Sequence, residues 1–508
     1  MKRLIFSAAT LCLLCGVHIY AQSSFTDAID SIGPEAGTID TDAEGWDLAG
    51  MAGLYLEENP MTDETDIYVQ LGLQPEFSLG PFGLGLNITV YYDIEKGEFK
   101  ESEYGEKEDY LKLIRYIRYG RHPKNDEVYL KAGALDHATL GHGFIINRYK
   151  TDVDYDNRRA GLVCNLNYEY WGLESFTNNL FLGEVIGLRA IARPLAGNPL
   201  PKINEIGFGL SYVMDRSAPY MLQDDWWYIT NDADNAASKN DPDFDDEDPD
   251  TWYWDKTQTD FLPDWDEDGN FIVEEDDSLT VWGLDAEFPL FRGNMLGMNF
   301  YVDYAQMRNV GDESGSFSSG IGAGFTFNFK LTQGNKLYLK VEERFMDSNF
   351  IPAYFDSLYE IERVQFSTEF PLLTKQAYLE SLDDDDRYEG IYAEIAFEML
   401  SMFQIWGTFQ DNHDVPNDGS VKMGLGFKDI GGISIAGEYT RKNIDDSDHN
   451  DIFTLDDRSI FLAYASYQIS AGLNAGVIFR REWTLNETTG EYEPVDSYNV
   501  GVAFNTSF

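Results

Sequence analysis

Cysteine and positively charged residues are both scarce in this sequence. Only 37 Lys and Arg stand against 89 Asp and Glu, and the formal net charge at pH 7 is -52. A chain so poor in bases argues against a nucleic-acid-binding protein, because contacts with phosphates require clustered cations. The sequence also has no run of 18 or more apolar residues, which argues against a bundle of membrane-spanning helices.

The composition is nevertheless that of a folded protein. Aromatic residues make up 15% of the chain, 43% of the residues are hydrophobic, and 45 Gly outnumber 17 Pro. These values argue against disorder throughout the chain and against a collagen-like repeat. The length of 508 residues fits several soluble domains or one large all-β barrel, so length alone does not choose between them.

Residues 1–21 have the pattern of a secretory signal peptide. Two bases precede an apolar stretch that is too short to span a bilayer, and Ala21 offers a small residue for cleavage. Cys12 and Cys15 raise the alternative of a lipid-anchored protein, but a Leu precedes each of them where a small residue is usual. We therefore expect export from the cytoplasm.

Removal of the signal peptide leaves Cys164 as the single cysteine, so no intramolecular disulfide can form. We expect residues 22–45 to be a short periplasmic N-terminal segment. Residues 46–508 then form the folded part of the chain, which includes a long acidic loop at about 215–278.

Hydrophobic alternation with a period of two dominates the folded part. Between residues 296 and 304, every second residue is apolar (Leu296, Met298, Phe300, Val302 and Tyr304), whereas the residues between them include Gly, Asn and Asp. This period predicts β-strands with two different faces. A soluble β-sandwich shows the same alternation, so the period alone does not place the strands in a membrane.

Three features favour a transmembrane barrel over a sandwich. The alternating segments run for about 10–14 residues, which suits tilted membrane strands better than the shorter strands of soluble proteins. Many segments end in Tyr, Trp or Phe, as expected at a membrane interface. Very short connections also alternate with long polar ones, and outer-membrane barrels have short periplasmic turns and longer extracellular loops.

The alternation predicts twenty strands, with 16 to 22 as the range, and both termini on the periplasmic side. The predicted strands are 46–57, 65–79, 83–95, 108–119, 127–135, 158–169, 172–179, 184–194, 203–214, 279–291, 295–309, 317–331, 335–346, 387–399, 402–411, 419–428, 432–441, 457–469, 472–483 and 495–508. The predicted fold class is therefore all-β, a transmembrane antiparallel β-barrel with long extracellular loops.

The last predicted strand carries the most specific signal. Tyr498, Phe504 and Phe508 lie on one alternating face, and Phe508 is the C-terminal residue. This segment resembles the closing strand of bacterial outer-membrane β-barrels, in which the terminal aromatic residue is read by the barrel-assembly machinery. The resemblance implies the outer membrane of a diderm bacterium as the location, with its lipids and that machinery as partners.

A barrel of about twenty strands has a lumen too wide for side chains to fill. TonB-dependent transporters fill theirs with a large N-terminal domain, whereas only residues 22–45 precede the first strand here. We therefore predict a porin-like channel for passive diffusion of small solutes, with residues 136–159 as the candidate for a loop folded into the lumen. The candidate pore-lining residues carry both signs of charge: Arg189, Arg193, Asp303, Lys330, Lys340, Glu342, Arg344, Glu394, Glu398, Glu438 and Arg480. Opposed charges can set selectivity, or they can simply solvate the lumen and pair across strands.

The acidic loop contains a calcium-like spacing. Between residues 224 and 277 there are 21 Asp or Glu against two Lys, with five Trp among them. Within this stretch, Asp264, Asp266, Asp268, Asn270 and Glu275 resemble the twelve-residue EF-hand loop, which binds Ca²⁺ through alternate oxygens. The helices of an EF-hand are missing from the flanking sequence, so a solvated acidic loop is the alternative. We expect the protein to require no cofactor. Ca²⁺ is the only ion for which the sequence suggests a binding site.

Other functions have weaker support. Asp136, His137 and His142 could form a metal or acid–base site, but the sequence shows no third group that converges on them, and common catalytic motifs are absent. We therefore expect no enzyme. The main alternative to a channel is a surface-exposed binding protein or adhesin that acts through the acidic, Trp-rich loop. A soluble sandwich and a channel for apolar cargo also stay open, as do monomeric and trimeric states.

Overall fold

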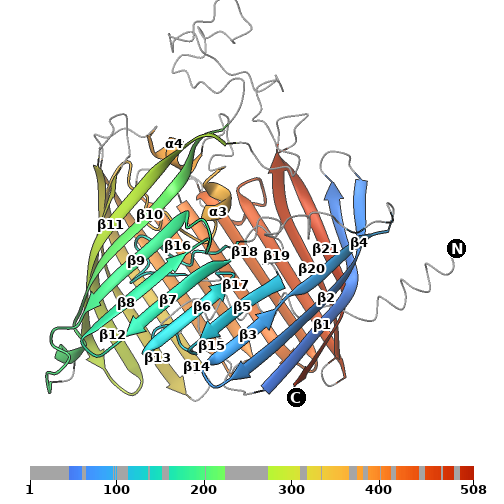
Figure 1. The fold of residues 1–508 in the computed structure, drawn as a ribbon, viewed down its shortest axis with the longest axis horizontal. Coiled ribbons are helices and arrows are strands. Elements are labelled where there is room, and N and C mark those ends of the chain that lie inside the picture. Colours follow the sequence, from blue (N-terminus) through green and yellow to red (C-terminus); the bar gives the residue numbers. More distant parts are fainter. Residues whose placement is uncertain are drawn as a thin grey trace, which may run out of the picture.

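The protein forms one closed, tilted β-barrel in a computed structural model (Figure 1). The structure describes residues 45–59, 64–94, 97, 99, 113–135, 138–151, 159–200, 202–222, 273–308, 317–332, 335–364, 374–380, 387–400, 402–413, 419–444, 452–470, 473–485 and 492–507. Each strand pairs antiparallel with its neighbours, and β1 pairs with β21, so the sheet closes on itself. Closure pairs the backbone groups of both edge strands, which a membrane requires.

The wall consists of twenty spanning strands, because β3 and β4 are two parts of one strand. Both pair with β2, and Asn87 interrupts them, its backbone N–H donating to Leu113 O at 2.8 Å. The first strands are β1 (Gly45–Asn59), β2 (Glu64–Leu79), β3 (Phe82–Leu86), β4 (Ile88–Asp93), β5 (Ile114–Tyr119), β6 (Val128–Gly133), β7 (Gly161–Asn167), β8 (Trp171–Thr177), β9 (Val185–Ala192) and β10 (Gly207–Leu222). The others are β11 (Val273–Arg292), β12 (Leu296–Arg308), β13 (Phe317–Thr332), β14 (Asn335–Asp347), β15 (Arg387–Met399), β16 (Phe403–Asn412), β17 (Gly419–Ile430), β18 (Ile433–Ile444), β19 (Ser459–Ser470), β20 (Leu473–Leu485) and β21 (Tyr492–Ser507). The helices are η3 (Ile203–Glu205), α3 (Tyr359–Glu362) and α4 (Lys375–Glu380).

The predicted fold class and the number of twenty strands are confirmed, and most strand bounds agree within a few residues. The acidic loop is shorter than predicted, because β10 continues to Leu222 and β11 begins at Val273. Ala218 in β10 and Leu279 in β11 are buried against segments inside the barrel. Such contacts extend the strands and cannot be read from local alternation.

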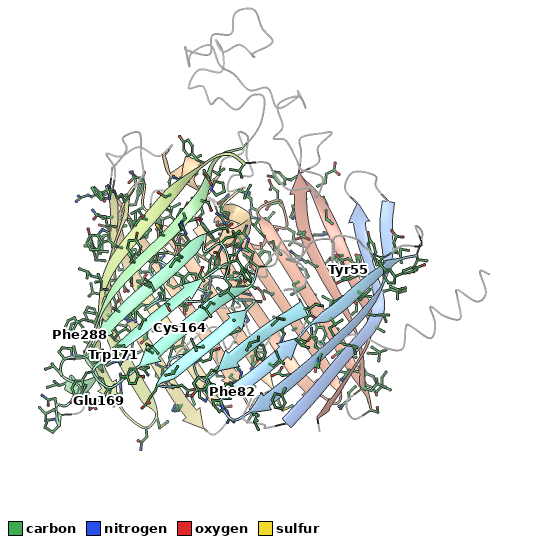
Figure 2. The ribbon with its side chains drawn as sticks, in the orientation of Figure 1. Tyr55, Phe82, Cys164, Glu169, Trp171 and Phe288 are labelled. Carbon is green, nitrogen blue, oxygen red and sulfur yellow. The ribbon has the colours of Figure 1, made fainter. Side chains whose placement is uncertain are left out.

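The two faces of the wall differ as the alternation predicts. On β14, Val341 and Phe345 are 46% and 48% exposed and point outward, whereas Glu342 and Arg344 between them are fully buried inside. An apolar exterior suits lipid, while the polar interior requires partners within the lumen. Figure 2 shows Phe82 and Trp171 at the end of the wall that carries the short turns, where interfacial aromatic residues are expected.

The connections are asymmetric. The turn at Gly431 and Gly432 lies at one end of the barrel, and the ends of β6, β10 and β14 that lead into the long connections lie at the other (Figure 1). Both ends of the wall sequence, at Gly45 and Ser507, lie on the short-turn side. No helix in the described part of the chain is long and apolar enough to cross a membrane.

Candidate functional site

Two connections fold into the lumen and form the candidate site. We name residues 134–151, between β6 and β7, the first inward segment. An isolated antiparallel bridge joins its two ends: the Ala138 N–H donates to Tyr149 O and the Tyr149 N–H to Ala138 O, both at 2.9 Å. The sequence analysis predicted an inward loop at 136–159, and the described residues of that range confirm it. Asp136 and His137 lie outside the described residues.

Gly133 lets the chain leave the wall and turn into the lumen. Its φ is +134°, and a Cβ at this position would lie 2.4 Å from the backbone O of Arg115. We therefore expect Gly133→Ala to lower the free energy of unfolding by about 1–3 kcal/mol from backbone strain, with the steric clash added. Gly80→Ala is the matched control, because Gly80 also has positive φ but no atom lies within 4 Å of an added Cβ. Urea unfolding of both variants in lipid vesicles checks this, and equal losses would contradict it.

The predicted strands 335–346 and 387–399 leave a long connection between them, and the second inward segment that it contains was not predicted. We name residues 348–364, which include α3, the second inward segment. It pairs with the first through a parallel bridge between Ile146 and Phe355, and the Ala353 N–H donates to Phe144 O at 2.8 Å. The four aromatic residues between 350 and 359 were the available signal, because a solvated loop does not need them.

The two segments share an apolar core with the inner wall, and this core occupies part of the lumen. Its buried residues are Leu135, Leu140, Phe144, Ile145, Ile146, Tyr149, Phe176, Val185, Val213, Ala218, Leu279, Val281, Ala305, Met307, Met346, Phe350, Tyr354, Phe355, Tyr359 and Leu379. Burying these apolar side chains away from water stabilises the inward position of both segments. The segments are therefore packed parts of the fold.

Charged residues of β14 and β15 anchor the first inward segment. Lys340 Nζ donates to His142 O at 2.6 Å, and Arg148 Nη2 lies 3.0 Å from Glu394 Oε1. Arg344 lies over the Phe144 ring, with 5.8 Å between its Cζ and the ring centroid. Lys340, Glu342, Arg344 and Glu394 were predicted to line the pore. The structure places them inside the barrel but buries them beneath the segment, so they hold the constriction in place.

An ion-pair network fixes the second inward segment to β10. Arg363 Nη2 lies 3.1 Å from Asp215 Oδ2 and donates to Ser217 O at 2.6 Å, while the Tyr359 hydroxyl donates to Asp215 Oδ2 at 2.7 Å. Burial alone would lower the pKa of Arg363, but Asp215 and the neighbouring acids hold it above its usual value. This guanidinium therefore stays charged.

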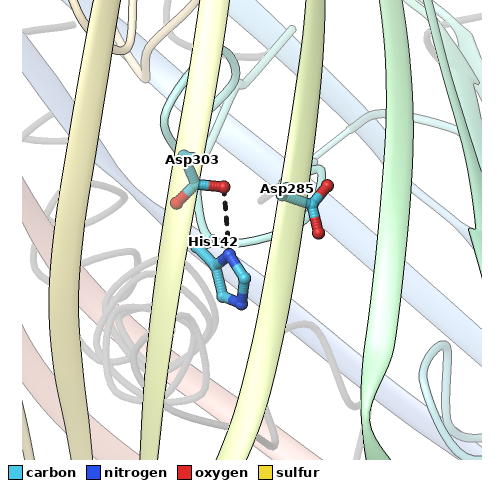
Figure 3. Close-up of side chains that lie close together, drawn as sticks. All are labelled: His142, Asp285 and Asp303. Carbon is cyan, nitrogen blue, oxygen red and sulfur yellow. Dashed lines mark hydrogen bonds and ion pairs between the residues drawn. The ribbon is translucent and has the colours of Figure 1, made fainter.

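His142 lies close to the carboxylates of Asp303 and Glu287 on the barrel wall, and Figure 3 shows its contact with Asp303. Its Nδ1 lies 3.0 Å from Asp303 Oδ1 on β12, and its Nε2 lies 3.8 Å from Glu287 Oε2 on β11. The imidazole stacks on Tyr301 with 4.2 Å between the ring centroids. Burial would lower the pKa of His142, but the two carboxylates outweigh it and raise the pKa to about 9. The sequence showed no further group that converges on His142. In the structure these groups are Glu287 on β11 and Asp303 on β12.

Arg189 forms the other half of this cluster. Its Nε and Nη2 donate to the two oxygens of Asp285 at 2.8 and 2.6 Å, and its Nη1 lies 3.0 Å from Glu174 Oε2. Glu174 Oε2 also accepts a bond from the Gly141 N–H at 3.1 Å. The predicted pore-lining residues Arg189 and Asp303 are thus both buried under the first inward segment.

The other predicted pore-lining residues lie elsewhere on the inner face or its rim. Glu398 and Glu438 are partly exposed and lie near Lys336 at 3.9 Å and Lys422 at 3.6 Å. Arg480 pairs with Glu482, and both side chains are about one-third exposed. Arg193 is half-buried and Lys330 is exposed near the short-turn end, where β9 and β13 finish.

The calcium and assembly predictions stay predictions. Asp264, Asp266, Asp268 and Asn270 lie outside the described residues, and the backbone of Glu275 in β11 pairs with that of Met221 in β10. Tyr498 is 38% exposed on the outer face, and its ring lies 5.0 Å from that of Phe479. The backbone of Phe504 pairs with Gly50 and Leu473, which places it in the strand that closes the barrel. Phe508 lies outside the described residues.

Comparison with known proteins finds no matching family model and no matching curated protein. Among solved structures, OccK11 (OpdR) of Pseudomonas aeruginosa has a TM-score of 0.32 and 8% identity, over 93% of this chain and 100% of its own. OccAB2 of Acinetobacter baumannii has a TM-score of 0.33 and 8% identity, over 92% of this chain and 98% of its own. OmpT of Vibrio cholerae has a TM-score of 0.31 and 7% identity, over 92% of this chain and 100% of its own.

The class of this protein follows from its own strand pairing and faces. A closed antiparallel barrel of twenty spanning strands with an apolar exterior is a transmembrane β-barrel of the outer-membrane type. Barrels of this class have short periplasmic turns and longer extracellular loops.

Proposed function

We propose that this protein is a porin-like channel that lets small hydrophilic solutes diffuse across the outer membrane. One observation carries the proposal: the two inward segments cover only part of the inner wall. Inward-facing groups under the segments, such as Glu342 and Arg344, are fully buried. On the remaining wall, the Arg480 and Glu482 side chains are 36% and 33% exposed to water.

The uncovered inner face has the chemistry of an aqueous passage. Arg115 on β5 pairs with Glu76 on β2, and their side chains are 30% and 17% exposed. Pairs of opposite charge keep a wall hydrated without binding one solute strongly, and conduction requires binding that is weak enough for release. Small polar solutes therefore suit this passage better than apolar cargo.

The experiment combines a gel assay with a bilayer recording. The mature protein, extracted in mild detergent, should migrate differently before and after boiling, because a closed barrel resists unfolding at room temperature. The unheated sample should give stepwise conductance in a planar bilayer, and the boiled sample, the control, should give none. A mobility shift without conductance would contradict the channel proposal. A protein that is soluble without detergent and shows no shift would contradict the membrane assignment.

The surface-binding alternative gains no support from the structure, because its acidic residues 223–272 lie outside the described residues. Deleting residues 230–265 distinguishes the two functions. A channel should keep its conductance after this deletion, whereas a binding protein should lose its partner. The expectations that the protein needs no cofactor and is not an enzyme stay predictions.

A further inference from the structure

We propose that His142, Asp303 and Asp285 form a binding site for a divalent transition-metal ion, which ties the first inward segment to β11 and β12. One ligand atom from each residue can be chosen so that all three lie within 4.8 Å of one another. In Figure 3 the two Asp project from neighbouring strands and the His reaches them from the inward segment. The proposal goes beyond diffusion and does not depend on whether the barrel conducts.

An unsatisfied oxygen points to a missing ligand. Asp303 is 5% exposed, and its Oδ1 lies against His142 while its Oδ2 is buried with no hydrogen-bond partner in the described part of the chain. A buried carboxylate oxygen without a partner is costly, because it has lost its hydration. A bound cation would satisfy this oxygen.

The charge around the site also favours a cation. Asp303 and Glu287 face His142, and Asp285 and Glu174 face Arg189. Four carboxylates against two cations leave a formal charge of -2 even when the imidazole is protonated. Lys340, which donates to the His142 carbonyl, lies 3.5 Å from Glu342, which also pairs with Arg344, and Arg292 pairs with Glu205. Metal binding releases the imidazole proton, so the four carboxylates and Arg189 then carry a formal charge of -3, which a divalent ion would reduce to -1.

The set of ligands selects the kind of ion. An imidazole nitrogen with two carboxylates suits Zn²⁺ and related transition metals, whereas Ca²⁺ and Mg²⁺ prefer oxygen ligands alone. The ring is already oriented by stacking on Tyr301 and by the Lys340 contact with its backbone carbonyl. Such fixed orientation of a ligand strengthens metal binding.

The structure also ranks the three ligands. Asp303 has a free oxygen, while both oxygens of Asp285 accept bonds from Arg189. Loss of Asp303 should therefore weaken metal binding more than loss of Asp285. Since losing a group that merely orients a ligand costs about 10–100-fold in affinity, losing His142 or Asp303 should cost at least that.

Calorimetric titration of the full-length mature protein in detergent with ZnCl₂ tests the site. Excess CaCl₂ in the buffer occupies oxygen-only sites, such as any in the acidic loop. The wild type should bind one Zn²⁺ that His142→Ala and Asp303→Asn lose, and Asp285→Asn should show a smaller loss. His413→Ala is the control, because His413 directly follows β16, whereas the cluster lies on β11 and β12, so this change should leave binding unchanged. Heat-modifiable mobility on gels selects the variants that fold.

Hydrogen exchange tests the structural consequence. Zn²⁺ should slow the exchange of amides in residues 138–151 in the wild type and not in His142→Ala. Binding that is equal in wild type and His142→Ala, or that Ca²⁺ competes away, would overturn the proposal. Binding without slower exchange would overturn the role of the ion in tying the segment to the wall. Neither result depends on the channel experiment.

Discussion

Replacing residues 139–148 with the dipeptide Asn-Gly is expected to raise the single-channel conductance several-fold. Ala138 and Tyr149 form an isolated bridge with two backbone hydrogen bonds, so a two-residue turn can join them without moving β6 or β7. The replacement removes Phe144, Ile145 and Ile146, which lie at the centre of the apolar core inside the barrel. The lumen should then lose its main obstruction on the side of β11–β15.

Planar-bilayer recording at fixed salt and voltage measures this effect. Deletion of residues 230–265 in the acidic connection is the control, because it shortens the chain but leaves the first inward segment intact. Heat-modifiable mobility shows whether each variant still closes. Unchanged conductance in a variant that closes would contradict the view that the first inward segment narrows the passage.

Glu342→Gln is expected to lower the free energy of unfolding by about 3–5 kcal/mol, because it leaves two buried cations without their counter-charge. Glu342 is fully buried, with Arg344 Nε at 2.6 Å, Lys340 Nζ at 3.5 Å and the Tyr301 hydroxyl at 2.7 Å. Gln keeps the size of the side chain, so the loss reports charge and not packing.

Glu398→Gln is the matched control on the neighbouring strand. Its partner Lys336 is 58% exposed and 3.9 Å away, so this change should cost no more than about 1 kcal/mol. Urea unfolding in lipid vesicles, followed by tryptophan fluorescence, compares the two variants. Equal losses would mean that the Glu342 site is open to water and lines the passage, as the sequence alone suggested.

Much of the barrel could be predicted from local pattern. Alternation identified all twenty spanning strands, and β15 was predicted with its observed bounds of 387–399. Such strands are readable because lipid on one side and polar groups on the other force a strict period of two. Agreement is poorer between residues 108 and 194, where β5–β9 are only six to eight residues long.

The inner surface was predicted in position but not in role. Alternation placed Lys340, Glu342 and Arg344 inside, and this is confirmed, because inward orientation is a local property of a strand. Their burial depends on Phe144 and the rest of the first inward segment, which is about 200 residues away in the sequence. The convergence of His142 with Asp303 has the same origin.

The sequence by itself therefore determined the wall: twenty strands, an apolar exterior, a charged interior and an end that carries the long connections. Each of these features repeats over short distances, and hydrophobic periodicity records it. Only the tertiary structure decided what occupies the lumen. The first and second inward segments, which are far apart in the sequence, pair at Ile146 and Phe355 and bury each other's aromatic residues. The sequence pointed to the first segment as an inward loop but not to its pairing with the second, because neither segment could bury that surface alone.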